Sequence, residues 1–87
     1  MNVTNQQPKT LYSFYNYQNY EHNAEYWARN GTKPFRYRQG FGMYGAKISE
    51  KIYSTDEILE IIKCGCVDVF EYDNFILFNT YSSCDMV

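Results

Sequence analysis

The side chains best suited to metal or nucleophilic chemistry in this chain are three cysteines and one histidine. They are His22, Cys64, Cys66 and Cys84. One residue separates Cys64 from Cys66, whereas paired cysteines in zinc sites are usually separated by about two to four. A nucleophilic Ser or Cys needs a base within hydrogen-bond reach, oriented by a third group, and His22 is the only imidazole. We therefore expect no metal site, no cofactor and no catalytic residue.

Carboxylates could act as general acids or bases, but the densest group of them follows an expected helix start. Asp56, Glu57 and Glu60 come directly after Ser54. Acidic side chains are favourable in the first turn of a helix because its N-terminus carries a partial positive charge. Their position therefore has a local structural explanation, and we expect the protein not to be an enzyme.

The most informative feature is the segregation of charge along the chain. The formal net charge is only −2. Residues 29–51 carry six cations and one carboxylate, a balance of +5, whereas residues 52–87 carry one cation and seven carboxylates, a balance of −6. Either the acidic part folds beside the basic segment and neutralises it, or the cations remain exposed and attract an acidic protein surface or a phosphate backbone.

The predicted partner-binding residues all lie in the basic segment. They are Arg36, Arg38, Phe41, Tyr44, Lys47 and Lys51. Arginine and aromatic side chains most often dominate interface energies. The chain contains 10 Tyr, 6 Phe and 1 Trp, more than one small core should need, and this excess favours a contact surface.

A β-hairpin is predicted to position these cations. Residues 34–39 and 46–53 both alternate apolar with polar side chains, which is typical of strands with one wet face. A four-residue loop between them would pair Phe35 with Ile48 and bring the cations onto one face. A register shifted by one residue would mix the two faces, so we expect the four-residue loop.

One helix is predicted before this hairpin, over residues 19–30. Glu25 precedes Arg29 by four residues, the favourable order for an ion pair on a helix. Asn30-Gly31 is typical of a left-handed C-terminal stop. The apolar stripe of this helix is Tyr20, Ala24, Trp27 and Ala28.

A second helix is predicted after the hairpin. Ser54 and Glu57 have the spacing of a capping box, in which the serine caps the helix and the glutamate reaches back. Gly65 is expected to end it. Its apolar face is Ile58, Ile61 and Ile62.

The last predicted element is a hairpin of residues 66–72 and 75–81 around Asp73-Asn74, two residues suited to a tight turn. This pairing places apolar side chains on both faces, although an antiparallel sheet in a small protein normally buries only one. The second face is therefore covered by the first helix and the tyrosine-rich residues 11–20, or it meets another chain.

Together these elements predict a small single α+β domain in the order helix, β-hairpin, helix, β-hairpin. Its sheet would be antiparallel, with about four strands and the helices mainly on one face. The domain would span residues 11–82, between a flexible tail at 1–10 and a loose end at 83–87. No apolar run approaches the ~20 residues needed to cross a bilayer, so no membrane partner is expected. The polar start and the odd number of cysteines predict a cytoplasmic protein.

The function predicted from these features is that of a small non-catalytic binding protein that occupies an acidic surface of a partner protein. Its size and lack of motifs are typical of inhibitors of host machinery encoded by phages or mobile elements, including anti-CRISPR proteins. Two other classes stay open: a nucleic-acid-binding module that uses the basic hairpin face, and a small ribonuclease-type toxin. A homodimer through the apolar face of the C-terminal hairpin also stays open.

Overall fold

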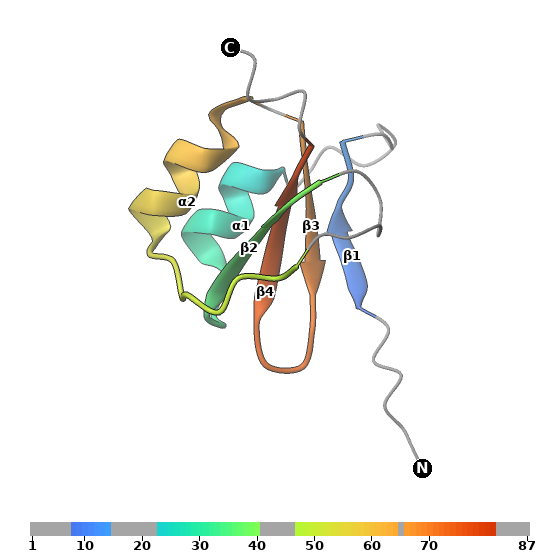
Figure 1. The fold of residues 1–87 in the computed structure, drawn as a ribbon, viewed down its shortest axis with the longest axis vertical. Helices are drawn as coiled ribbons and strands as arrows, with labels where there is room; N and C mark the ends of the chain where they lie inside the picture. The colour runs from blue at the N-terminus through green and yellow to red at the C-terminus, as the bar shows by residue number, and fades with distance from the viewer. Residues whose placement is uncertain (1–7, 15–22, 41–46, 65, 82–87) are drawn as a thin grey trace.

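The structure, a computed structural model, describes residues 8–14, 23–40, 47–64 and 66–81. Within them the strands form one four-stranded sheet in the order β1-β3-β4-β2, and both helices lie on the same side of it (Figure 1). The predicted α+β class is confirmed. The elements are β1 (Lys9–Tyr12), α1 (Ala24–Asn30), β2 (Phe35–Gln39), α2 (Thr55–Ile61), the 3-10 turn η1 (Ile62–Cys64), β3 (Val67–Glu71) and β4 (Ile76–Thr80).

The C-terminal hairpin forms in the predicted register. β3 and β4 pair antiparallel with Glu71 opposite Ile76. The Tyr72 N–H donates to the Phe75 carbonyl at 2.9 Å, which closes the turn over Asp73 and Asn74. Every residue of β4 is buried, so this strand is the centre of the fold.

The pairing of β2 differs from the prediction. β2 lies parallel to β4, in a register that runs from Phe35 opposite Ile76 to Gln39 opposite Thr80. The sheet is therefore mixed, and the expected all-antiparallel sheet is wrong. Two parallel strands need a long connection through other elements, and here α2 and β3 connect β2 to β4. The alternation within β2 predicts a strand, but it does not predict which strand pairs with it.

The predicted strand at residues 46–53 is also wrong over its described part, residues 47–53. This segment runs along the outer edge of β2, where the Ser49 N–H donates to Tyr37 O and the Tyr53 N–H donates to Phe35 O, each at 2.8 Å. The expected pair of Phe35 with Ile48 does not form, because Phe35 bridges Tyr53 instead. The Ser49 hydroxyl accepts a hydrogen bond from the Tyr37 N–H. In a regular pair of strands a backbone carbonyl would accept this bond.

Helix α1 is capped at its N-terminus by Asn23, whose side chain accepts from the Tyr26 N–H at 2.9 Å. Ala24 and Ala28 are buried, as the predicted stripe requires. The expected ion pair between Glu25 and Arg29 forms at 3.0 Å. The predicted helix residues 19–22 lie outside the described residues.

The left-handed stop predicted at the end of α1 is wrong. Gly31 has φ −67° and ψ 145°, which is extended backbone open to any residue. A Cβ at Gly31 would lie 2.8 Å from Trp27 O and 2.9 Å from Cδ1 of Ile76. Glycine is therefore needed here because the helix end packs closely on β4, and not because of its backbone conformation.

Helix α2 begins as the sequence predicts. The Ser54 hydroxyl accepts from the Glu57 N–H at 3.1 Å, and the Glu57 carboxylate accepts from the Ser54 N–H at 2.9 Å. Both halves of the capping box are therefore present. Ile58 and Ile62 are buried against the sheet.

The hydrophobic core lies between the two helices and one face of the sheet. The core cluster is Ala24, Ala28, Phe35, Ile58, Ile62, Val67, Val69, Ile76 and Phe78.

Strand β1 begins at Lys9, inside the predicted flexible tail, because its backbone pairs with β3 from Lys9 opposite Glu71 onward.

No helix in the described ranges is long and apolar enough to cross a bilayer.

Candidate functional site: the helix-free face of the sheet

The two faces of the sheet carry different side chains. Val67, Val69, Ile76 and Phe78 belong to the core cluster beneath the helices. Successive side chains on a strand point to opposite faces, so their neighbours lie on the other side. We call that side the helix-free face, because α1 and α2, the helices of the described residues, both lie on the opposite side of the sheet (Figure 1). Its residues on β2, β3 and β4 are Arg36, Arg38, Asp68, Phe70, Leu77 and Asn79.

A polar row crosses the helix-free face at one level of the sheet. Asn79 on β4 is opposite Asp68 on β3 and opposite Arg38 on β2. The Arg38 Nε donates to Oδ1 of Asn79 at 2.8 Å. The Asn79 amide in turn donates to Gly40 O at 3.4 Å. Asn79 is only 2% exposed, so this bond holds the guanidinium in place through Nε and leaves its terminal N–H groups outside this bond.

Asp68 closes the other end of the row. Its side chain is buried, and a buried carboxylate is costly unless it is hydrogen-bonded. Oδ1 accepts from the Phe14 N–H at 2.8 Å, and Oδ2 accepts from the Tyr81 hydroxyl. Asp68 therefore connects the residues that follow β1 to the end of β4, and both of its oxygens have a partner within the chain.

Arg36 occupies the next row along β2. Its guanidinium carbon lies 4.8 Å from the centroid of the Phe75 ring, a distance at which a cation is attracted by a ring face. Its Nε donates to Ser49 O at 2.6 Å. The Phe75 ring stacks on Tyr72 with centroids 4.6 Å apart. One arginine and two rings thus form a continuous aromatic and cationic surface.

A cavity of about 320 Å³ opens on this face. It falls in the range of ligand pockets, about 300 to 1,000 Å³. Aromatic side chains form much of its wall, and Arg38 supplies N–H donors. The wall therefore combines apolar and aromatic surface with one guanidinium and one carboxylate. The described lining is Pro8, Arg38, Asp68, Phe70, Tyr72, Asn79 and Tyr81.

Lys51, a predicted site residue, is directed toward helix α2. Its Nζ lies 2.9 Å from Oε2 of Glu57 and 4.6 Å from the centroid of the Tyr53 ring. The hydrogen bond to Glu57 raises the pKa of Lys51. The pKa of Glu57 is lowered by the Ser54 backbone N–H and by Lys51. The acidic half of the chain thus partly neutralises the basic segment at this point.

The other predicted site residues are placed as follows. Arg36 and Arg38 share the helix-free face, and Lys47 is exposed in the segment beside β2. Phe41 and Tyr44 lie outside the described residues. Four cations form ion pairs with carboxylates within the described part of the chain, and Arg36, Arg38 and Lys47 are not among them. The paired cations are Arg29, Lys33, Lys51 and Lys63.

The candidate site also contains residues that the sequence did not single out. The predicted pairing of the C-terminal hairpin places Phe70 and Tyr72 on one of its two apolar faces, but it does not place them beside the arginines. Asn79 had no sequence signal at all, since its role comes from the parallel pairing of β2 with β4. The adjacency of the basic strand and the aromatic hairpin face is a property of the tertiary structure.

Within the described residues, no group of three or more His, Cys, Asp and Glu side chains is placed to hold a metal ion. Cys66 is half-buried and is not in a disulfide bond. His22 and Cys84 lie outside these residues.

No family model, curated protein or solved structure matches this chain.

Proposed function

We propose that this chain is a non-catalytic binding domain that occupies an acidic surface of another protein with the helix-free face of its sheet. The observation that carries the proposal is the position of Arg38 in the wall of an aromatic-lined cavity of about 320 Å³, with Arg36 two residues before it on the same face of β2. An apolar or aromatic side chain of the partner enters the cavity, and acidic residues around it meet the two guanidinium groups.

The chemistry of the two arginines supports this assignment. Each uses its Nε within the chain, Arg36 on Ser49 O and Arg38 on Oδ1 of Asn79. The terminal N–H groups are the part of the guanidinium that binds a carboxylate end-on. Because the Nε bonds hold both side chains in place, less conformational entropy is lost on binding.

The distribution of ion pairs supports an acidic partner. Arg29 and Lys63 on the helical side are each bound to a glutamate. Arg36 and Arg38 contact neutral acceptors instead, a carbonyl and an amide. Their charge remains available to a partner, where it increases the association rate and selects a negative surface.

The test needs a partner captured at this face. A photoreactive benzoylphenylalanine at Tyr72 covalently traps proteins that contact the helix-free face in the native host. Each trapped protein is then purified and titrated calorimetrically against the unmodified chain. We expect one of them to bind directly and reversibly; if none does, the proposal is wrong.

The residues are tested with two double variants that change the net charge equally. Arg36→Glu/Arg38→Glu alters the helix-free face, and Arg29→Glu/Lys63→Glu alters the helical side. We expect the first to weaken partner binding at least tenfold and the second to change it less than twofold. Equal losses of affinity in the two double variants, or no loss in the first, would contradict binding through the helix-free face.

Nucleic acid is the competing partner of an arginine and aromatic surface. A labelled single-stranded RNA is therefore titrated at about 50 and 200 mM salt, because phosphate binding weakens steeply with salt. Absent or weak binding, with the RNA left intact, is expected. Tight, salt-sensitive binding that the Arg36→Glu/Arg38→Glu variant abolishes would replace a protein partner by a nucleic acid, and RNA cleavage would contradict a non-catalytic function.

A further inference from the structure

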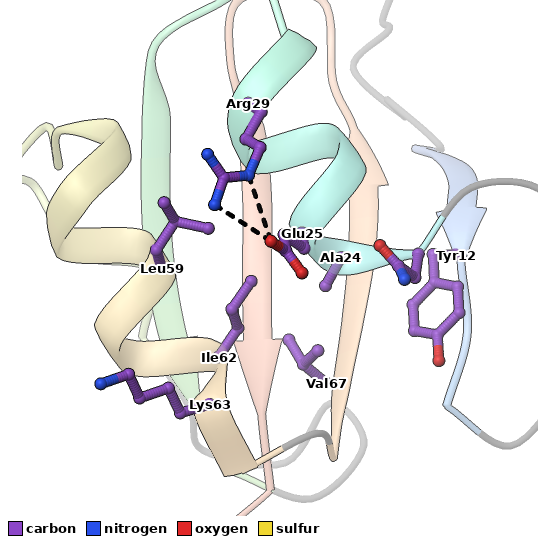
Figure 2. Close-up of a pocket in the computed structure, with 9 residues that line it drawn as sticks. Tyr12, Ala24, Glu25, Arg29, Leu59, Ile62, Lys63 and Val67 are labelled. Carbon is purple, nitrogen blue, oxygen red and sulfur yellow. Dashed lines mark hydrogen bonds and ion pairs between the residues drawn. The ribbon is translucent and has the colours of Figure 1, made fainter.

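A second cavity, of about 470 Å³, opens on the helical side of the sheet, between α1, α2 and the start of β3 (Figure 2). Its floor is apolar, since Ala24, Ile62 and Val67 are buried and Leu59 is half-buried. The small side chain of Ala24 leaves room between the helices. The described lining is Tyr12, Asn23, Ala24, Glu25, Arg29, Leu59, Ile62, Lys63 and Val67.

The mouth of this cavity carries an ion pair. Figure 2 shows the Arg29 guanidinium and the Glu25 carboxylate meeting above the apolar floor. Nε and Nη2 of Arg29 both contact Oε2 of Glu25, at 3.1 and 3.0 Å. Both side chains are more than half exposed. An exposed ion pair of this kind contributes little stability, so Arg29 can exchange Glu25 for another carboxylate at small cost.

The lining carries more cations than carboxylates. Lys63 also lines the cavity, and its partner Glu60 is not a lining residue; their ion pair at 3.1 Å is exposed, like that of Arg29, and contributes little stability. The lining therefore holds two cations and one carboxylate above an apolar floor. A ligand that matches it has an aliphatic body and a single negative head.

We propose that this cavity binds a small amphipathic monocarboxylate, with its aliphatic chain on Ala24, Leu59 and Ile62 and its carboxylate on Arg29. Glu25 competes with the ligand for Arg29. The site is separate from the helix-free face, and the inference does not depend on the function proposed for that face.

The test is a titration of the full, ¹⁵N-labelled chain with sodium octanoate below its micelle concentration, followed by amide chemical shifts. Shifts should concentrate on the amides of Ala24, Leu59, Ile62 and Val67. Butanoate should bind at least tenfold more weakly, because each methylene lost removes buried apolar area. Octyltrimethylammonium, whose alkyl chain is about as long and whose charge is opposite, should also bind more weakly. No shifts at these amides, or equal binding of the cation, would overturn the proposal.

Two variants at exposed positions test whether the carboxylate of the ligand binds Arg29. Arg29→Gln should weaken octanoate binding about threefold, and Glu25→Gln should strengthen it about threefold by removing the competitor. An unchanged affinity in both variants, or a weaker one in Glu25→Gln, would overturn the assignment of the carboxylate to Arg29. Arg36→Glu/Arg38→Glu should leave the octanoate-induced shifts at Ala24, Leu59 and Ile62 unchanged, which separates this inference from the proposed function.

Discussion

Arg38 on β2 and Asn79 on β4 are opposite each other in the parallel register, and the Arg38 Nε donates to Oδ1 of Asn79 at 2.8 Å. This bond joins the most basic strand of the chain to the strand at the centre of the sheet. It also fixes an arginine at the wall of the cavity on the helix-free face. One buried amide thus links the stability of the fold to the orientation of the candidate site.

Replacing that amide should affect both properties. Asn79→Ala removes the acceptor of Arg38 and the donor to Gly40 O, so we expect a loss of about 1 to 3 kcal/mol in the free energy of unfolding. Urea denaturation measures it. Thr32→Ala, at an exposed position outside the helices and strands, is the control and should change the stability little. A stability equal to wild type in Asn79→Ala would contradict the role of this bond.

The close approach at the end of α1 predicts an intolerant glycine. In Gly31→Ala the new methyl group would lie 2.8 Å from both Trp27 O and Cε1 of Phe35. Because a backbone oxygen cannot rotate away, we expect a destabilisation of about 1 to 3 kcal/mol from overpacking. Thermal or urea denaturation measures it. The backbone angles suit alanine, so a stabilised variant would mean that α1 shifts to make room.

The buried carboxylate of Asp68 predicts a large effect from the loss of one hydroxyl. Tyr81→Phe removes the donor to Oδ2 of Asp68 and leaves the ring in place. Because hydrogen bonds to charged groups are stronger than neutral ones, the expected cost is about 1.5 to 3 kcal/mol. Tyr72→Phe, on the same face, should cost much less. Similar losses in the two variants would show that the hydroxyl of Tyr81 has no special role.

The capping box of α2 predicts a dependence of stability on pH. The folded-state pKa of Glu57 is lowered from its ordinary value of 4.5, mainly by the Ser54 N–H and then by Lys51. Ionised Glu57 therefore stabilises the fold above pH 4.5, and this contribution is lost as the pH falls through the lowered pKa. Glu57→Gln should be less stable than wild type at neutral pH.

That difference between Glu57→Gln and wild type should shrink as the pH falls below 4.5, and urea midpoints measured across this range check it. Lys51→Met should reproduce part of the neutral-pH loss, because it removes the hydrogen bond at 2.9 Å. Ser54→Ala should cost about 1 kcal/mol through loss of the cap. A difference that stays constant with pH would contradict the lowered pKa of Glu57.

Sequence reasoning predicted the elements that depend on neighbouring residues. The capping box of Ser54 and Glu57, the turn at Asp73 and Asn74, and the ion pair of Glu25 with Arg29 all form as expected. Each depends on residues at most four positions apart, so its geometry is set by local backbone and side-chain preferences. The alternation in β2 correctly placed Arg36 and Arg38 on one face of a strand.

The pairing partner of β2 was decided only in the tertiary structure. Phe35 and Tyr37 could lie against residues 46–53 or against β4, and alternation is the same in both cases. Parallel pairing with the buried strand β4 satisfies the backbone of β2 in five consecutive residue pairs. Over its described part, residues 47–53, the segment beside β2 forms only isolated backbone bonds to the outer edge of that strand.

The parallel pairing of β2 with β4 also brings the residues of the candidate site together. The sequence alone determined a small α+β fold, two helices with the capping box of the second, and a strand with both arginines on one side. It could not place Arg38 beside Asn79, nor Arg36 over Phe75, since each pair is separated by about forty positions and meets only through the register of β2 on β4. Non-local pairing depends on the burial of the whole chain, which no local pattern encodes.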